Sequence, residues 1–308
     1  MNRREFIKVA LPPALALAAT SCLPGCTNGN DNTSTPDPSE EGLGPVGDVV
    51  ITTDFGRHDS LGNYHRINMR DHTVARYTDT NDVLWESGGL GIELGTFSLP
   101  TDMEADDQGF LYVVDSGNSR IVALDARGKH LYAFGGYGTH FGKLNIPRAI
   151  ALFNDELFVA DAINHRIHTF NTGGNPLRVV GSFGTGPGQL NAPVALAFDS
   201  KGNLHVADKG NARIQVYESQ SGGWLGSYGA RGTDAGQFSA PSSIVIDKND
   251  FVYIADAATS SLIIFDSEGE LVERRKPVLD SGVEAVPWRL HLSPDGTLLV
   301  TTTAVADT

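Results

Sequence analysis

Cysteine is almost missing from this 308-residue chain: it has two, Cys22 and Cys26, and both lie near the N-terminus. The long remainder therefore has no cysteine pair that could form a disulfide or supply thiolates to a metal ion. Its stability has to come from side-chain packing.

Positive charge is also sparse. The chain has 23 Lys and Arg residues against 37 Asp and Glu residues, which leaves a formal net charge of −14. Proteins that grip nucleic acid phosphates need clustered Lys and Arg. The composition argues against nucleic acid as a partner and favours neutral or cationic partners.

Catalytic motifs and membrane-spanning runs are lacking as well. The chain contains no HExxH, nucleophile elbow, P-loop or CxxC sequence. The apolar stretch from Val9 to Ala19 is shorter than the roughly 20 residues of a membrane helix, and Pro12 and Pro13 interrupt it. The sequence therefore leans away from an enzyme and disfavours a transmembrane anchor.

Residues 1–26 have the layout of an export signal. Arg3 and Arg4, followed closely by Phe6 and a mildly apolar core, resemble a twin-arginine signal. The sequence LPGC that ends at Cys26 resembles a lipoprotein cleavage box, so we expect Cys26 to be acylated, with Cys22 as the second choice. The alternative is an ordinary cleaved signal with two idle cysteines.

Residues 27–47 are rich in Asn, Thr, Ser, Pro, Asp and Gly and cannot bury enough apolar surface to order themselves. They are predicted to be a disordered linker between the membrane lipid and the folded part. Thr27 stands where some lipoproteins carry the Asp that retains them at the inner membrane. These features predict a lipid-anchored protein of the bacterial cell envelope, on the periplasmic or outer-membrane side.

One unit recurs from residue 88 to the end of the chain. Each copy opens with a glycine-rich connector that ends in proline: GGLGIELGTFSLP, GGYGTHFGKLNIP, GSFGTGPGQLNAP and GSYGARGTDAGQFSAP. The prolines, numbered 100, 147, 193, 241 and 287, follow one another at intervals of 47, 46, 48 and 46 residues. Each interval is one structural module.

Each module continues with short strands rich in Val, Ile, Leu and Phe, separated by Asp, Gly and Asn turns, which is typical of an antiparallel meander. Such a meander buries its faces only when copies are stacked around an axis. A proline-led strand, a second strand ending in Val-Ala-Asp, and a following Asn and Arg-Ile resemble the NHL repeat. With fainter copies at 73–89 and 288–303, the resemblance implies an all-β, six-bladed β-propeller of four-stranded blades over residues 48–308, closed by an N-terminal strand near 48–53.

An aspartate recurs in four copies, three of them with the Asn and Arg. A single active site does not need four copies of one ligand, so we expect these aspartates to accept backbone hydrogen bonds in the turn after the second strand, with the Asn and Arg tying that turn to the next strand. A carboxylate ring around a metal in the pore is the other interpretation. The four residues are Asp115, Asp161, Asp208 and Asp256.

The candidate site lies where the copies differ. Two and four residues after the proline most copies carry small or apolar side chains, but two copies carry Asp102 and Glu104, and Arg289 and His291. Inner strands line the channel of a propeller, so these four are predicted to converge at one side of its mouth, either as a polar ligand site or as an internal ion pair.

The position directly after the proline adds three further candidates, Thr101, Arg148 and Trp288. Arg148 offers a planar fork for a carboxylate, and Trp288 offers an apolar or cation-binding face. The peptidyl-hydroxyglycine lyases, which share the NHL-type architecture that this chain resembles, hold zinc through histidines at this position. This chain has no histidine there. Sugar-lactonase propellers bind a pore metal through Glu, Asn and Asp, to which Glu104 or Asp102 could contribute, so no cofactor is evident but a divalent metal stays possible.

These patterns favour a non-enzymatic scaffold whose rim loops bind another exported or membrane-associated protein or peptide, with a membrane respiratory assembly as one setting. Two other functions stay open. One is a metal-dependent lyase or lactonase-like hydrolase with its site at the channel mouth. The other is a small-molecule or glycan binder.

Overall fold

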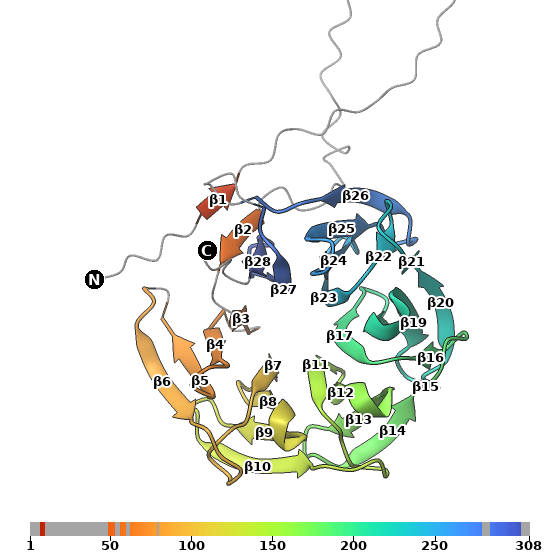
Figure 1. The fold of residues 1–308 in the computed structure, drawn as a ribbon. Helices are drawn as coiled ribbons and strands as arrows, with labels where there is room; N and C mark the ends of the chain where they lie inside the picture. The colour runs from red at the N-terminus through yellow and green to blue at the C-terminus, as the bar shows by residue number, and fades with distance from the viewer. Residues whose placement is uncertain are drawn as a thin grey trace, which may run out of the picture.

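The computed structural model describes residues 7–9, 49–52, 56–59, 62–78, 80–278 and 284–302. It is a β-propeller whose four-stranded blades surround a central axis (Figure 1). The predicted signal residues Arg3, Arg4 and Phe6, both cysteines and the linker lie outside the described residues. In the described part of the chain, no helix is both long enough and apolar enough to span a bilayer.

Five blades are antiparallel meanders of consecutive strands, with the first strand of each blade nearest the axis. The first blade contains β3 (Gly56–His58), β4 (Tyr64–Asn68), β5 (Thr73–Tyr77) and β6 (Val83–Gly88). The second contains β7 (Pro100–Ala105), β8 (Leu111–Asp115), β9 (Arg120–Leu124) and β10 (His130–Gly135), and the third contains β11 (Pro147–Phe153), β12 (Glu156–Asp161), β13 (Arg166–Asn171) and β14 (Pro176–Val180). The fourth contains β17 (Pro193–Phe198), β18 (Asn203–Asp208), β19 (Arg213–Glu218) and β20 (Trp224–Tyr228), and the fifth contains β23 (Pro241–Ile246), β24 (Val252–Asp256), β25 (Ser261–Phe265) and β26 (Leu271–Arg275). These blades confirm the predicted meander.

A further four-stranded sheet is composite. Its strand order is β1-β2-β28-β27, from β1 (Ile7–Val9), β2 (Val49–Thr52), β28 (Leu298–Thr302) and β27 (Pro287–Leu292). The N-terminal strand expected near 48–53 is found here, and β2 pairs with β28 in parallel, with Val49 opposite Leu298. Figure 1 shows this junction where the red and orange N-terminal strands meet the blue C-terminal ones. The pairing covers an edge of β28 that would otherwise be open.

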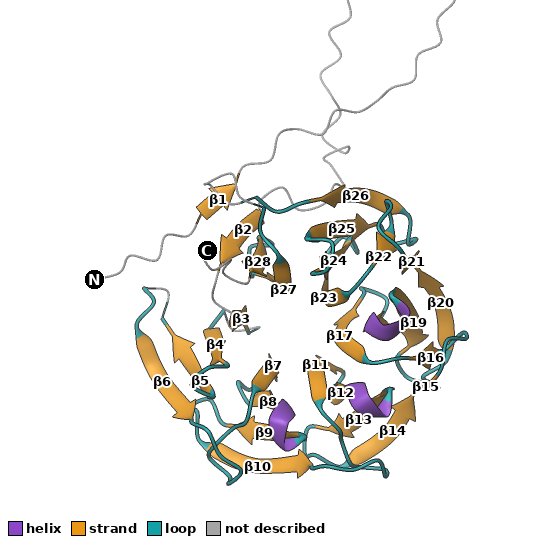
Figure 2. Ribbon diagram, in the orientation of Figure 1, coloured by secondary structure: helices purple, strands orange, loops and turns teal. Residues whose placement is uncertain are grey.

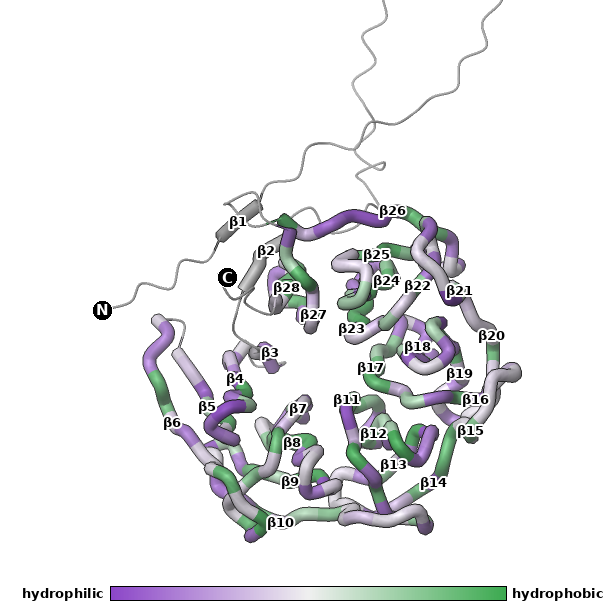
Figure 3. The backbone as a smooth tube through the Cα atoms, in the orientation of Figure 1, coloured by the Kyte–Doolittle hydropathy of each residue, from purple (hydrophilic) through white to green (hydrophobic). Residues whose placement is uncertain are grey.

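The core lies between adjacent blades. In β8 and β24 every residue is buried, as expected for strands packed on both faces. One apolar cluster joins Phe158 and Ile167 of the third blade to Val206 and Tyr217 of the fourth. Figure 3 shows that hydropathy differs between inner and outer strands: inner strand β17 is mostly hydrophobic, and outer strand β26 is largely hydrophilic. Each blade thus depends on its neighbours for burial.

The glycine-rich connectors close over the start of each inner strand. In four connectors the residue three positions before the proline is completely buried: Phe97, Leu144, Leu190 and Phe238. Two connectors also carry short parallel pairs, β15 (Ser182–Phe183) with β16 (Gln189–Leu190) and β21 (Ala230–Arg231) with β22 (Gln237–Phe238). The opening residue Gly181 has a φ of +76°, and a Cβ on it would stand 2.7 Å from the Leu190 side chain. Glycine is required there because the loop folds directly onto its own buried anchor.

Short 3-10 turns separate the second and third strands of three blades (Figure 2). They are η2 (Ser116–Asn118), η3 (Ala162–Asn164) and η4 (Lys209–Asn211). Each ends on a residue in the left-handed region, such as Ala212 with a φ of +53°. These turns carry the recurring Asn of the repeat and place it beneath the connector.

Candidate functional site

The recurring aspartates belong to the scaffold, as predicted. Asp208 is fully buried and accepts hydrogen bonds from the backbone N–H of Asn191 at 2.6 Å, from Asn211 Nδ2 at 2.7 Å and from Arg213 Nε at 3.0 Å. Asp115 and Asp161 make the same set of bonds. The interpretation as a metal ring is not supported, because all three carboxylates are fully committed to this network away from the channel lining.

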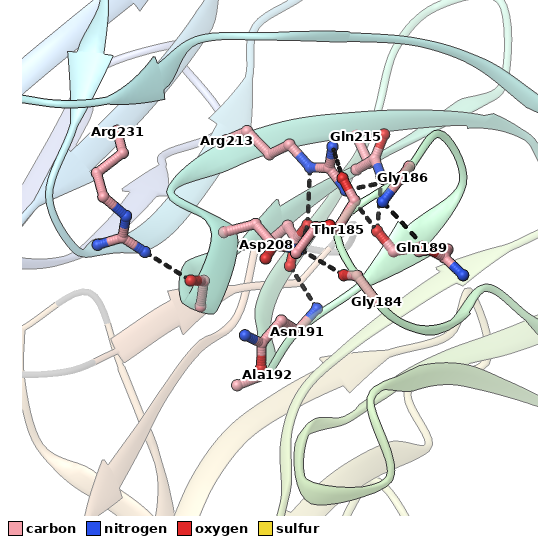
Figure 4. A network of polar contacts seen from close by, with 12 residues as sticks. Gly184, Thr185, Gly186, Gln189, Asn191, Ala192, Asp208, Arg213, Gln215 and Arg231 are labelled. Atoms are coloured by element: carbon pink, nitrogen blue, oxygen red, sulfur yellow. Dashed lines mark hydrogen bonds and ion pairs between the residues drawn. The ribbon is translucent and has the colours of Figure 1, made fainter.

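The partners of this network differ from those expected. The backbone donor belongs to the connector, and Arg213 also donates to the connector carbonyls of Thr185, Gly186 and Gln189, at 2.9, 2.9 and 2.7 Å (Figure 4). The Asp and Arg therefore tie the turn after the second strand to the connector before the blade, and not only to the next strand. The connector is held in place by charge-assisted bonds.

The fifth blade keeps only the aspartate, Asp256, which accepts bonds from the backbone N–H groups of Ser239 and Ala240. Its missing arginine is replaced from another strand. Arg274 of β26 donates to the connector carbonyls of Asp234 and Gln237, at 2.5 and 3.1 Å. The same loop is thus held by a guanidinium that the repeat alignment does not reveal.

Four of the seven candidate site residues line a cavity of about 560 Å³ on the propeller axis. Its lining has two unlike halves. The polar half comes from the first and second blades and the composite sheet: Arg57, His58, Asp59, Asp102, Glu104, Arg289 and His291. The apolar half comes from the third, fourth and fifth blades and includes Ala151, Leu152, Ala197, Phe198, Val245 and Ile246. The four residues that break the repeat pattern at two and four positions after the proline therefore do come together.

Arg289 crosses the axis. From β27 its Nη2 donates to the backbone carbonyls of Thr101 on β7, at 2.8 Å, and of Arg148 on β11, at 3.3 Å. The side chain is 9% exposed, and its Nη1 lies 3.9 Å from Asp102 Oδ2. Asp102 in turn accepts from the backbone N–H of Ile150 at 3.1 Å. The internal ion-pair interpretation thus fits this pair, which braces three inner strands across the channel.

Glu104 faces a second arginine that the repeat pattern did not reveal. Arg57 Nη2 of β3 lies 2.5 Å from Glu104 Oε2, and Arg57 Nη1 donates to the carbonyl of Met103 at 3.0 Å. Burial raises the pKa of Glu104 to about 7; the Arg57 charge opposes this rise and the Asp102 charge adds to it. This carboxyl therefore changes its protonation near neutral pH.

His291 is held as a neutral ring. Its Nε2 accepts the backbone N–H of His58 at 2.8 Å, and the two imidazoles stack with centroids 5.5 Å apart. Burial, together with the charge of Arg57, keeps the pKa of His291 well below its usual value. Because Nε2 is the acceptor, the proton of the neutral ring sits on Nδ1. The cavity wall thus includes a fixed N–H donor.

The three residues directly after the proline do not line this cavity. In five inner strands the ladder shifts register between the proline and the second residue after it, so the residue between them is a β-bulge. Thr101, Arg148 and Trp288 occupy this bulge in their strands. Thr101 Oγ1 donates to the carbonyl of Arg148 at 3.2 Å, which keeps the bulges of β7 and β11 together.

Metal-ligand geometry is not assembled in the described part of the chain, where no group of three His, Cys, Asp or Glu side chains is placed to share an ion. The nearest candidates, Asp102 and Glu104, each face an arginine. His205 is buried and lies 3.4 Å from Asp199 and 2.9 Å from the Tyr228 hydroxyl. The donor set therefore favours ion pairs over a cation.

Comparison with known proteins agrees with the repeat. No family model matches the chain. It is 32% identical over 165 residues to human NHL repeat-containing protein 3 and 26% identical to the mouse protein. The matched stretch is 51% of this chain and 34% of each relative, so it spans about a third of these curated relatives. The predicted resemblance to NHL-repeat propellers is thus supported by distant sequence similarity.

Solved structures share the fold. A streptogramin B lyase superposes with a TM-score of 0.57 at 15% identity, covering 81% of this chain and 90% of that chain. A gluconolactonase from Xanthomonas campestris superposes with a TM-score of 0.61 at 16% identity, covering 81% of this chain and 82% of that chain. At these identities the likeness establishes a propeller of the same structural class and carries no activity over to this chain.

Proposed function

We propose that this protein is an exported, lipid-anchored propeller of six blades that binds a small molecule in its axial cavity. Cleavage before Cys26 would remove β1 and leave β2, β28 and β27 as the sixth blade. The observation that carries the proposal is the division of the cavity lining into a charged half and an apolar half. A volume of about 560 Å³ suits a drug-sized molecule, since ligand pockets commonly measure roughly 300–1,000 Å³. The ligand class is therefore a molecule with a hydrogen-bonding head and an apolar body.

The chemistry of the two halves supports this orientation. The head would meet the neutral Nδ1–H of His291 and the Arg57–Glu104 pair, while the body would lie against Ala197 and Val245. Scaffold packing alone does not require buried charge on one side of a channel, because charged groups there are costly to desolvate. Binding energy from a ligand offsets that cost.

A thermal-shift screen of small polar-headed, apolar-bodied compounds on the full chain tests the proposal. Compounds that raise the unfolding midpoint should lose their effect in Glu104→Gln, which alters the polar half, and in Ala197→Leu, which fills the apolar half. Arg127→Met changes an exposed arginine and serves as the matched control. Hits whose effect survives both cavity variants would contradict the proposal. The anchor is tested separately by labelling with radioactive palmitate, which Cys26→Ala should abolish.

A protein-binding scaffold is a second candidate, favoured by a different observation. Large apolar side chains stand exposed on the connectors, including Ile92 at 74%, Tyr137 at 78% and Phe183 at 65%. Each of these three connectors is bound in the same way by the Asn of the turn after the second strand, so their exposed side chains lie at equivalent places in three successive blades. Exposed apolar surface of this kind commonly marks a protein contact. A crosslinked envelope complex that is lost in the double variant Ile92→Asn, Tyr137→Asn and kept in Val272→Asn would support it; equal crosslinking in all three would exclude it.

A further inference from the structure

The bulge residues lie at the opposite end of the inner strands from the cavity. The guanidinium of Arg289 crosses the axis to carbonyls of β7 and β11, and the cavity lies on the side where the inner strands end. On the other side, where the inner strands begin, stand the five bulge residues. They are Thr101, Arg148, Val194, Ser242 and Trp288. None of them lines the cavity, so Arg289 separates two chemically different ends.

Arg148 is unusual among the arginines of the propeller. It is half-buried, yet within the described residues its guanidinium makes no hydrogen bond and no ion pair; only its backbone carbonyl is engaged. The other arginines that are at least partly buried there all have partners, as Arg120 and Arg178 illustrate with their carboxylates at 2.7 and 2.8 Å. The two remaining arginines without such contacts, Arg70 and Arg127, are exposed to solvent.

The electrostatic surroundings of Arg148 are positive. Burial lowers its pKa, and the charge of Arg289 lowers it further. The nearest carboxylate that the channel offers, Asp102, is already engaged with Arg289 and with the backbone of β11. Partial desolvation of a guanidinium without a counter-charge is costly, and its rigid fork of donors matches a planar oxyanion.

We infer that Arg148 is the anchor of an anion site at the connector end of the channel, and that the anion is a carboxylate. One uncompensated positive charge matches a monoanion, and the fork can bind both oxygens of a carboxylate at once. Thr101 positions the site by holding the carbonyl of Arg148 toward β7. The carboxylate could belong to a free organic acid or to the C-terminus of a peptide, and these two sources share the same recognition chemistry.

The test compares the thermal unfolding midpoints of the full chain and its variants in three solutions of equal ionic strength. One contains chloride alone, one contains sodium benzoate, and one contains chloride with benzamide, the uncharged analogue of benzoate. Benzoate should raise the midpoint of the unmodified protein and benzamide should not. In Arg148→Met the benzoate response should vanish, with affinity at least about tenfold weaker. Without benzoate this variant should be as stable as the unmodified protein or more stable, because an uncompensated charge has been removed.

Three further variants and two peptides complete the design. Arg148→Lys keeps the charge and loses the fork, so it should fold normally and bind benzoate more weakly; Arg127→Met should change nothing. Glu104 lines the axial cavity, so Glu104→Gln should leave the benzoate response intact. That result would separate the Arg148 site from the axial cavity. N-acetyl-trialanine with a free carboxylate, compared with its amide, distinguishes a peptide source from a free acid.

Two results would overturn the inference. One is a benzoate or free-acid peptide effect no larger than that of the neutral match. The other is an Arg148→Met variant that is markedly less stable while retaining its benzoate response, since that would make Arg148 an internal support.

Discussion

Replacement of Arg213 by Met removes four hydrogen bonds at once, one to Asp208 and three to connector carbonyls. Asp208 is fully buried and Arg213 is 16% exposed in its side chain, so the change leaves a buried carboxylate without its counter-charge. Breaking one partner of such a pair costs about 3–5 kcal/mol. We expect the lower part of this range, because water can reach the freed carbonyl of Thr185, whose bond is exposed.

Urea unfolding followed by far-ultraviolet circular dichroism measures this loss, and calorimetry should show a midpoint lowered by about 6–15 °C, since each kcal/mol is worth about 2–4 °C in a domain of this size. Arg127→Met is the control and should stay within about 0.5 kcal/mol of the unmodified protein. A loss below about 1 kcal/mol for Arg213→Met would refute the view that this network holds the connector.

The fifth blade supplies an internal comparison. Arg274 binds the connector carbonyls that an arginine at position 261 would otherwise take. Arg274→Met should therefore also destabilise the protein, but by less than Arg213→Met, because Arg274 bonds to connector carbonyls and not to the buried carboxylate of Asp256. A neutral effect would mean that the fifth connector is held by Asp256 alone.

Three other expectations follow from single contacts. The pKa of Glu104 is raised from 4.5 to about 7, so its contribution to the free energy of unfolding is complete below about pH 4.5 and is lost as the pH rises through 7. Glu104→Gln should remove this decrease from the pH dependence of the free energy of unfolding. His205→Phe removes the bonds to Asp199 and Tyr228 and should lower the free energy of unfolding in urea by about 1–3 kcal/mol. His205→Tyr should recover a bond to Asp199, because tyrosines at the equivalent position of two other blades bond to the equivalent aspartates, Asp106 and Asp247. Gly229→Ala places a Cβ against the ring of Phe238 at a φ of +73° and should lower the calorimetric midpoint by more than the substitution at Gly223, where the backbone has no such conformation.

Much of the fold could be predicted because the same sequence pattern occurs in several successive copies. Regular proline spacing predicted the modules, and departures from the pattern selected Asp102, Glu104, Arg289 and His291, which the structure places around one cavity. Such inference works because blades related by one axis place equivalent residues at equivalent heights.

The remaining features depend on information outside the repeat. Arg57 and His58 were missed because the first blade has no connector and no proline to align its inner strand. Arg274 was missed because a guanidinium can reach the same carbonyls from another strand. The parallel pairing of β2 with β28 was not predictable, since register across the closure depends on distant chain ends and not on local periodicity.

The β-bulge at the start of these inner strands makes the identity of one side chain independent of the strand pairing. Its residue is left out of the ladder, so its side chain can change while the strand pairing stays as it was. A gene that grows by duplicating blades therefore inherits, with each copy, a position that selection can change at little cost in folding. Arginine at this position in one blade and tryptophan in the composite sheet show how widely its chemistry varies within one chain.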